Sequence, residues 1–389
     1  PSDQYSQIQV TTTPTGGNWI AAAVRLQNNG QNGYVGLYFA NNGNPELMLF
    51  KRSNGNWSQL SSYASGVLAT GTTVTITAVG NTIALLENST VVASASDPAY
   101  SGGAPGVMAS GTTTADNWSG GSAGFQVYYS GTDASGISYY DMISANDGYG
   151  VQVLRVLQPT HPTTGVPHNF LYVLPVEPGQ GSTYGDGLAT LQAMDAQDLY
   201  NLTIVEPGFY LDPWYANNPN DPNLQYETFM TNDLVPWVRT SLATSGTEQN
   251  WLIGFSKSGY GGQDLLLKHP DIFTLAASWD FPADMTSYDQ YGSSPAANYG
   301  TDANFQANYR LTSSFVSQHG GPFQTANRIW IGGYALYEWD MNDYDPLLTG
   351  AGVVHTYGPN QQLTHRWDSG WVPTAMAALY QDSLRLPGG

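Results

Sequence analysis

The sequence contains no cysteine, few basic residues and no long apolar run. Without cysteine the chain has no disulfides, no cysteine nucleophile and no thiolate metal site. It has 11 Lys and Arg against 30 Asp and Glu, a net charge of −19. This charge argues against nucleic acid or an anionic membrane surface as a partner, because both bind clustered cations. No stretch stays apolar over the roughly 18 residues that a membrane-spanning helix needs.

The chain is rich instead in aromatic and small polar residues. Aromatic residues make up 13% and charged residues 11% of the 389 positions, the opposite of the balance typical of disorder. A chain of this length can form two domains with full cores. We therefore expect a folded protein with a polar but weakly charged surface.

The first 123 residues have the pattern of an all-β domain. Strand-like segments separated by Asn- and Gly-containing turns cover residues 7–10, 19–26, 34–39, 46–50, 73–77 and 82–86. Many short strands at regular spacing predict a β-sandwich. The stretch SGGSAG at residues 119–124 is the best linker candidate, so we expect a sandwich domain over 1–123 and a second domain over 124–389.

Residues 73–88 and 97–107 resemble the concanavalin-like jelly-roll modules of the laminin-G type. Such modules are often attached to secreted enzymes that act on carbohydrates, so the resemblance implies a secreted protein. It also implies glycan binding by this module through exposed aromatic side chains, for which Trp57, Tyr63 and Trp118 are the candidates.

After residue 124 the pattern changes to alternating strands and helices. Strands are expected at residues 150–157, 169–174, 203–205, 251–253, 273–278 and 328–331, and helices at 226–238, 263–269 and 372–380. This order predicts an α/β domain, a mostly parallel sheet with helices on both faces.

Residues 251–262, WLIGFSKSGYGG, have the layout of a nucleophile elbow, a strand and a helix joined by a sharp turn. The turn holds the hydroxyl of Ser256 exposed, and a serine needs such exposure beside a base to act as a nucleophile. The usual pattern is G-x-S-x-G. Here Gly254 and Ser256 fit, but Ser258 replaces the last glycine.

Four stretches together resemble the esterase D branch of the α/β-hydrolases, which includes feruloyl and acetylxylan esterases and mycolyl transferases. They are FLYVLP at 170–175, YETFMTNDL at 226–234, GFSKSGYGG at 254–262 with KHPDIF at 268–273, and THRWDSGW at 364–371. The resemblance implies a serine hydrolase with a triad in the chain order serine, acid, histidine.

Ser256 is then the nucleophile and His365 the base, because His365 precedes the last helix. His355 is the only serious competitor for the base. The acid is expected after the strand at 328–331, where Glu338 and Asp340 both qualify.

Asp280 is a third choice for the acid, because its strand also ends at the catalytic edge; its other expected role is hydrogen bonding in the substrate pocket. Trp339 is expected to line the same pocket. We expect no cofactor and no metal site.

The oxyanion of the reaction needs two backbone N–H donors. Lys257 is expected to provide one, and Val176 or Glu177 the other. Related proteins usually carry a His-Gly pair in the second loop, where this chain has Pro175 and Val176. This departure leaves open that the site is impaired.

We therefore expect a secreted serine esterase that removes acyl groups of the feruloyl or acetyl type from a plant or microbial polysaccharide, held on the glycan by its β module. One alternative is a polyester or lipid-type esterase or an acyltransferase. Another is a non-catalytic glycan-binding protein built on a degenerate hydrolase fold.

Overall fold

The computed structural model describes residues 2–179, 181–333, 336–359 and 362–386. The chain forms two compact units, Pro1–Gly131 with Tyr139–Gln152, and Thr132–Ser138 with Val153–Gly389. Among the described residues, no helix has the length and apolar character needed to cross a membrane.

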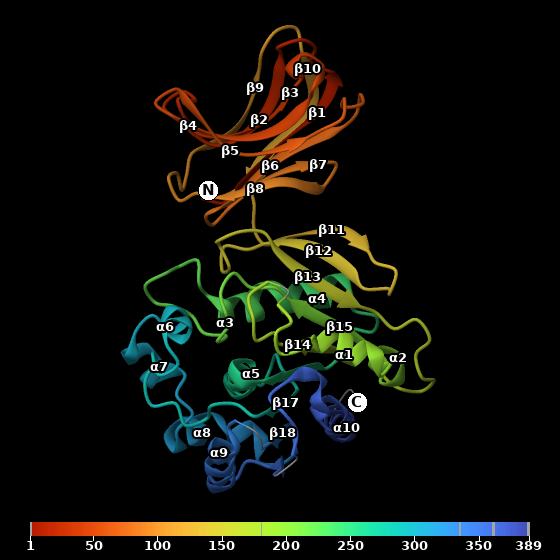
Figure 1. Ribbon diagram of the computed structural model, residues 1–389, viewed down its shortest axis with the longest axis vertical. Coiled ribbons are helices and arrows are strands. Elements are labelled where there is room, and N and C mark those ends of the chain that lie inside the picture. Colours follow the sequence, from red (N-terminus) through yellow and green to blue (C-terminus); the bar gives the residue numbers. More distant parts are fainter. Residues whose placement is uncertain (1, 180, 334–335, 360–361, 387–389) are drawn as a thin grey trace. The chain divides into compact units, whose positions relative to one another are not determined.

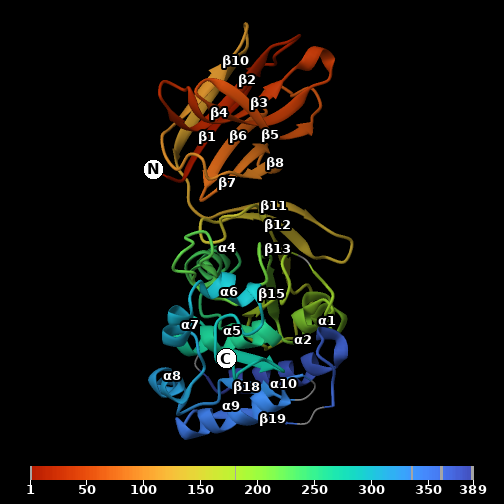
Figure 2. The ribbon, with the colours of Figure 1, turned by 60° about the vertical axis from the view of Figure 1, so that its left-hand side comes forward.

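In the first unit, two five-stranded antiparallel sheets have the orders β10-β1-β6-β7-β8 and β5-β4-β3-β2-β9 (Figure 2). Their strands are β1 (Gln4–Thr12), β2 (Trp19–Gln27), β3 (Asn32–Phe39), β4 (Glu46–Ser53), β5 (Asn56–Ala64), β6 (Thr73–Val79), β7 (Thr82–Glu87), β8 (Thr90–Ser96), β9 (Ala104–Ala109) and β10 (Thr114–Ser122). The short helix η1 (Asn41–Gly43) lies between β3 and β4.

The core of the sandwich is formed by alternating apolar residues from both sheets. Ile8 of β1, Ile76 of β6 and Leu85 of β7 share this core with Ile20 of β2. Gly36 lets the sheets approach closely, because a Cβ there would lie 2.5 Å from Leu85 Cδ1. The predicted β-sandwich is confirmed. Residues 119–122, expected as linker, instead form the end of β10 and pair with β1.

A nine-stranded sheet follows, with the order β11-β12-β13-β15-β14-β16-β17-β18-β19 (Figure 1). Its strands are β11 (Gln126–Thr132), β12 (Ser138–Ile143), β13 (Gln152–Leu157), β14 (Asn169–Val173), β15 (Leu202–Pro207), β16 (Asn250–Phe255), β17 (Leu275–Trp279), β18 (Ile329–Gly332) and β19 (His355–Gly358). β13 pairs with β15 antiparallel, and the pairs from β15 through β14, β16, β17 and β18 to β19 are parallel.

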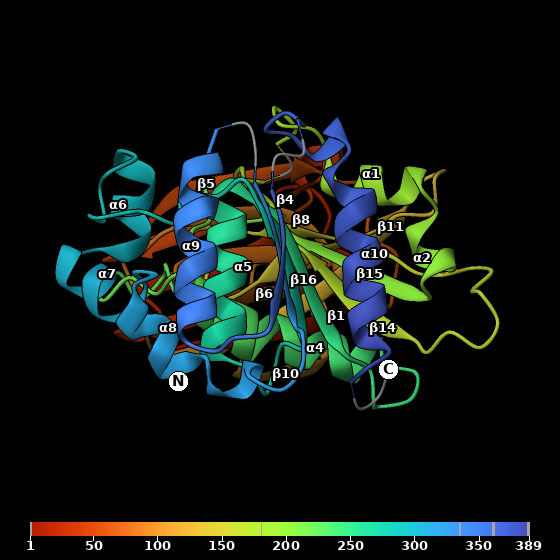
Figure 3. The same cartoon turned by 90° about the horizontal axis from the view of Figure 1, so that it is seen from below.

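Helices cover both faces of this sheet, with α5, α8 and α9 on one side and α1, α2 and α10 on the other (Figure 3). The helices are α1 (Gly187–Ala193), α2 (Ala196–Leu199), α3 (Tyr226–Thr228), the π-helix η2 (Phe229–Leu234), α4 (Val235–Ser241), α5 (Ser256–Lys268), α6 (Ser293–Tyr299), α7 (Asp302–Asn308), α8 (Ser313–His319), η3 (Gly321–Phe323), α9 (Glu338–Gly350), η4 (Trp367–Ser369) and α10 (Trp371–Ser383). The predicted α/β architecture is confirmed. Because the parallel strands end at one edge, the loops that follow β14, β16 and β17 lie close together.

Candidate active site

Ser256 lies at the turn between β16 and α5, as predicted for a nucleophile elbow. Its backbone φ is 54°, in the left-handed region that residues with a side chain rarely adopt. The turn requires glycine at position 254, because a Cβ there would lie 2.8 Å from the carbonyl oxygen of Ser258. Strain of this kind is concentrated at functional sites, where the surrounding structure enforces it.

Ser258 fits the position of the usual glycine because its hydroxyl is bonded inside the turn. Its Oγ donates to the carbonyl oxygen of Phe255 at 2.8 Å and accepts from the Phe255 N–H at 3.2 Å. The side chain is fully buried, so both bonds are shielded from water. The departure from G-x-S-x-G therefore closes the turn with a side-chain bond and leaves the elbow intact.

His365 contacts the carboxylate of Asp280, with 2.5 Å between Nδ1 and Oδ2. Asp280 directly follows β17, which pairs in parallel with β16, so it lies at the same sheet edge as Ser256. The Ser256 N–H donates to the carbonyl oxygen of Asp280 at 3.1 Å. The imidazole also packs edge-on against Phe255, the residue before the serine, with 4.9 Å between ring centres. The structure thus brings together Ser256, Asp280 and His365.

The carboxylate of Asp280 is fully buried and held by three donors. Besides His365, it accepts from the N–H groups of Tyr337 at 2.6 Å and of Leu336 at 3.3 Å. Charge-assisted bonds from backbone N–H groups fix a carboxylate firmly, because the donors cannot rotate away. The segment after β18 therefore supplies donors to the acid.

The expectation that Glu338 or Asp340 would face His365 is corrected by this geometry. Glu338 begins α9 and is half-buried, and the Asp340 carboxylate accepts the N–H of Asp284 at 3.0 Å. Asp280, the third choice from the sequence, is the carboxylate that contacts His365. The sequence feature that indicated Asp280 is its position at the end of β17, the strand beside β16. The family resemblance instead predicted an acid in the segment after β18.

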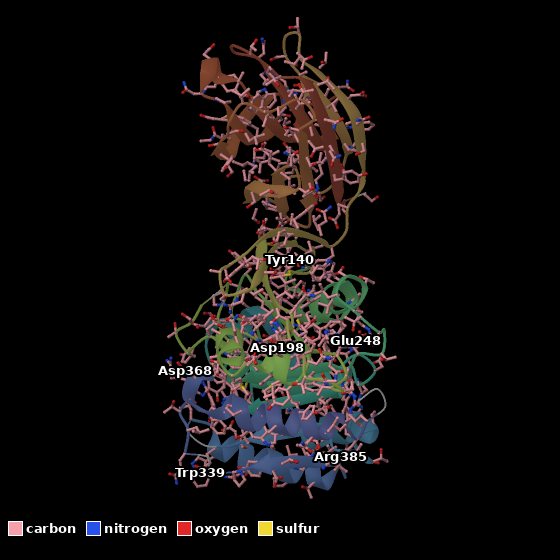
Figure 4. All side chains as sticks on the ribbon, turned by 90° about the vertical axis from the view of Figure 1, so that its right-hand side faces the viewer. Tyr140, Asp198, Glu248, Trp339, Asp368 and Arg385 are labelled. Atoms are coloured by element: carbon pink, nitrogen blue, oxygen red, sulfur yellow. The ribbon has the colours of Figure 1, made fainter. Side chains whose placement is uncertain are left out.

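Trp339, expected in the substrate pocket, is 80% exposed in the first turn of α9 (Figure 4). His355, the competitor for the base, begins β19 and so lies at the amino ends of the parallel strands, whereas Ser256 lies at their carboxyl ends. Its Nε2 contacts Asp345 at 2.8 Å and its Nδ1 the carbonyl of Val353 at 2.9 Å. His365 is therefore the histidine at the elbow.

The expected oxyanion donors lie in the first turn of α5 and in the loop after β14, both at the carboxyl ends of the parallel strands. Lys257 is in the first turn of α5, and its ammonium is held by Asp212 at 2.8 Å. Val176 is buried and Glu177 half-buried in the loop after β14, the strand on the other side of β16. Tyr215 fixes this loop by donating its hydroxyl to the carbonyl of Pro175 at 3.0 Å. Their role as oxyanion donors stays a prediction.

Aromatic rings surround the imidazole of His365. Besides Phe255, the rings of Tyr337 and Tyr184 lie 5.7 and 5.9 Å from it, measured between ring centres. The wall continues from Tyr337 to Tyr291 at 6.0 Å, and Tyr291 stacks on Trp214 at 6.2 Å. Burial is the main cause that raises the pKa of Tyr337 and of Tyr291 above the ordinary value. The phenols of Tyr337 and Tyr291 therefore remain neutral near neutral pH, and their rings form a largely apolar wall beside the imidazole.

Carboxylates lie close enough to these rings for their charges to act on them: Asp340 and Asp284 on Tyr291, and Asp340 on Tyr337. Partial burial raises the pKa of Asp284, and together with the neighbouring carboxyl groups of Asp340 and Asp343 it brings this pKa to about 6. Burial likewise raises the pKa of Asp340. These groups share negative charge at close range, so an anionic molecule nearby would be disfavoured.

A buried ionic cluster anchors the C-terminal end of the elbow helix. Glu227 of α3 accepts from Lys268 Nζ and from the Tyr309 hydroxyl, both at 2.7 Å, and its other oxygen contacts His269 Nε2 at 2.7 Å. Burial alone would raise the pKa of Glu227, but the bonds from His269, Lys268 and Tyr309 lower it to about 2. The YETFMTNDL stretch therefore fixes the helix that carries Ser256 at its other end.

Residues 205–325 match the family model described as "Putative esterase". This span contains Ser256 and Asp280. No curated protein matches the chain. The match covers less than half of the chain and, together with the α/β fold, it supports an esterase-type hydrolase domain that acts on carboxylic esters; a β-sandwich precedes this domain.

Solved structures similar to the chain include a ferulic acid esterase, at 15% identity over 63% of this chain and 95% of that one, with a TM-score of 0.47. The fluorophosphonate-binding serine hydrolase FphF of Staphylococcus aureus matches at 18% identity over 64% and 98%, with a TM-score of 0.47. The carbohydrate-binding module CBM66 of Bacillus subtilis matches at 22% identity over 31% and 76%, with a TM-score of 0.28.

Proposed function

We propose that the protein is a serine esterase in which Ser256 is the nucleophile, His365 the general base and Asp280 the acid that orients it. The observation that carries this proposal is the 2.5 Å contact between His365 Nδ1 and Asp280 Oδ2, next to a serine whose φ is 54°. An acid bonded to Nδ1 leaves Nε2 free to accept a proton, which is the role of the acid in a serine triad.

The reaction follows from these positions. His365 Nε2 takes the proton of Ser256 Oγ as that oxygen attacks the ester carbonyl carbon. The imidazolium returns the proton to the leaving alcohol while the carbon–oxygen bond breaks. Water then loses a proton to His365 and attacks the acyl carbon. The bond from this carbon to Ser256 Oγ breaks, His365 returns the proton to that oxygen, and the acid is released. The backbone N–H groups of Lys257 and of Val176 or Glu177 are the proposed donors to the oxyanion.

We further propose that the acyl group is carried by a polysaccharide outside the cell and is of the feruloyl or acetyl type. Support for an aromatic acyl group comes from the rings of Tyr184, Tyr337 and Tyr291 near His365. The carboxylates of Asp284 and Asp340 favour a neutral ester over its anionic acid.

The direct test measures hydrolysis of p-nitrophenyl acetate and methyl ferulate by the wild type, by Ser256→Ala and by Ser293→Ala, an exposed-serine control. We expect the wild type and Ser293→Ala to hydrolyse an ester that Ser256→Ala does not. A preference for methyl ferulate would support an aromatic acyl pocket. Equal activity of Ser256→Ala and wild type would contradict the proposal.

The same proteins test the remaining alternatives. An added alcohol acceptor that yields a new ester would identify an acyltransferase. A chain that no fluorophosphonate labels, yet that binds glycans, would indicate a degenerate hydrolase. The bonded position of Ser258 removes one reason for that second alternative, because the elbow is complete without the last glycine.

A further inference from the structure

The sandwich sheet β5-β4-β3-β2-β9 has apolar side chains on both faces. One face contributes to the core with the other sheet. On the opposite face, Ala21, Ala23, Val35 and Leu37 form a separate buried cluster. Larger side chains that pack around this cluster are only partly buried: Trp19, Leu26, Phe39, Met48, Phe50 and Met108. The outward face of a sandwich is normally polar, and an exposed apolar face is typical of a binding site.

The face carries a pocket of about 380 Å³, within the roughly 300–1,000 Å³ typical of small-molecule sites. Its lining consists of aromatic and aliphatic residues and one glycine: Gly17, Trp19, Leu37, Phe39, Met48, Phe50 and Trp57. Trp57 packs edge-on against Trp19 at 5.8 Å and against Phe50 at 5.5 Å between ring centres. Packed rings of this kind form walls against which a flat ligand can lie.

The lining determines the chemistry of the occupant. None of the lining side chains carries a charge, and the indole N–H groups of Trp19 and Trp57 are their only polar atoms. A sugar placed here would lose water from hydroxyls that find few partners, at a cost for each unmade bond. An aromatic ring has few such groups and would gain from burial.

The charge distribution favours a neutral occupant over an anion. The whole chain carries a net charge of −19, and the lining offers no cation to pair with a carboxylate. A cation does border the pocket: Arg52 is not part of the lining, but its guanidinium lies 4.8 Å from the centre of the Trp57 ring. This guanidinium already interacts with the face of that ring, and its Nη1 donates to the carbonyl of Gly30. An uncharged ring therefore fits the pocket better than the corresponding aromatic acid.

We propose that this pocket binds an uncharged aromatic ring, as carried by an ester-linked aromatic group. The link to esters rests on the proposed function, whereas the ring-binding property rests on the sandwich alone. The module would then hold the enzyme to parts of its substrate that still carry esterified aromatic groups, and release it where hydrolysis has removed them, because the freed anionic acid fits the pocket less well.

The test uses the full chain with Ser256→Ala, so that no ester is consumed, and measures binding of methyl cinnamate and of sodium cinnamate by equilibrium dialysis. Trp57→Ala removes a wall that is 40% exposed, so we expect the fold to survive. Gly17→Phe adds a side chain where a Cβ would meet no atom within 4 Å, and would fill the pocket from its rim. Tyr63→Ala, on the same strand but outside the lining, is the matched control.

We expect one class of methyl cinnamate sites to weaken about tenfold or more in Trp57→Ala and in Gly17→Phe, and to stay unchanged in Tyr63→Ala. When the three substitutions are made in the chain that keeps Ser256, each variant should hydrolyse p-nitrophenyl acetate at the rate of the wild type. Equal binding by Trp57→Ala and Tyr63→Ala would overturn the proposal. The proposal would also be overturned if the chain bound cinnamate more tightly than methyl cinnamate. The same holds if Trp57→Ala and Gly17→Phe lost binding of xylooligosaccharides and kept that of methyl cinnamate, or if this face proved to be the interface of a dimer. If the parent Ser256→Ala chain bound no methyl cinnamate while the wild type hydrolysed esters, the pocket proposal alone would fail. If the parent chain bound methyl cinnamate but the wild type hydrolysed no ester, the esterase proposal alone would fail.

Discussion

The buried carboxylate of Asp280 bonds to His365 Nδ1, and the backbone carbonyl of the same residue accepts the N–H of Ser256. One residue therefore contacts both partners of the proposed proton transfer. Asp280 itself has a φ of 45°, so the turns after β16 and after β17 are both left-handed. The two strained turns support each other through this backbone bond.

Asp280→Asn is expected to lower kcat by roughly 10⁴-fold, because an amide in this position can hold the imidazole in the wrong tautomer. The measurement is the steady-state hydrolysis of p-nitrophenyl acetate. Glu338→Gln is the matched control and should retain activity near that of the wild type. If Glu338→Gln lost as much activity as Asp280→Asn, the assignment of the acid would be wrong.

Ser258→Ala is expected to destabilise the hydrolase unit by about 1–3 kcal/mol, because it removes a buried hydroxyl that bonds both backbone groups of Phe255. The same change should lower kcat, since the turn that positions Ser256 is loosened. Denaturant unfolding followed by tryptophan fluorescence gives the free energy of unfolding. Ser293→Ala, at an exposed position, should leave both quantities unchanged, and an equal loss there would point to a non-specific effect.

Glu227→Gln is expected to destabilise the protein at pH 7 by roughly 3 kcal/mol, because Lys268 and His269 lose a buried charged partner. The pKa of Glu227 is lowered from 4.5 to about 2, so its ionic contribution is present above pH 4.5 and is lost as the pH falls toward 2. The difference in free energy of unfolding between wild type and variant should therefore shrink between pH 4.5 and pH 2. A difference that is constant over this interval would show that the charge of Glu227 is not the cause.

Asp284→Asn is expected to raise stability at pH 7.5 and to leave it unchanged near pH 3.5. The pKa of Asp284 is raised from 3.8 to about 6, so the folded state holds its proton more tightly than the unfolded chain. The resulting destabilisation is absent below pH 3.8, grows as the pH rises and is complete above about pH 6. Melting temperatures at the two pH values measure the effect. Asp289→Asn, at an exposed aspartate, is the control, and a gain of the same size there would contradict the argument.

The sequence alone determined the elements whose patterns are local. Alternating apolar residues in 73–77 and 82–86 predicted β6 and β7, and small residues around Ser256 predicted the turn between β16 and α5. These patterns arise from the periodicity of one strand or helix and from the space at one turn, which neighbouring residues encode directly. Ser256 and His365, the proposed nucleophile and base, could be chosen for the same reason, because each lies next to a recognisable element.

Only the tertiary structure decided which carboxylate faces His365. Asp280, Glu338 and Asp340 all follow strands that end at one edge of the sheet, so order along the chain cannot rank them. The choice depends on the pairing of β17 with β16 and on the N–H groups of Leu336 and Tyr337, which are more than 50 residues from Asp280 in the chain. The apolar outer face of the sandwich likewise could not be predicted from the sequence. Side chains from four separate strands meet there only when the sheet forms, and the pattern within one strand does not reveal that the outer face of the whole sheet is apolar.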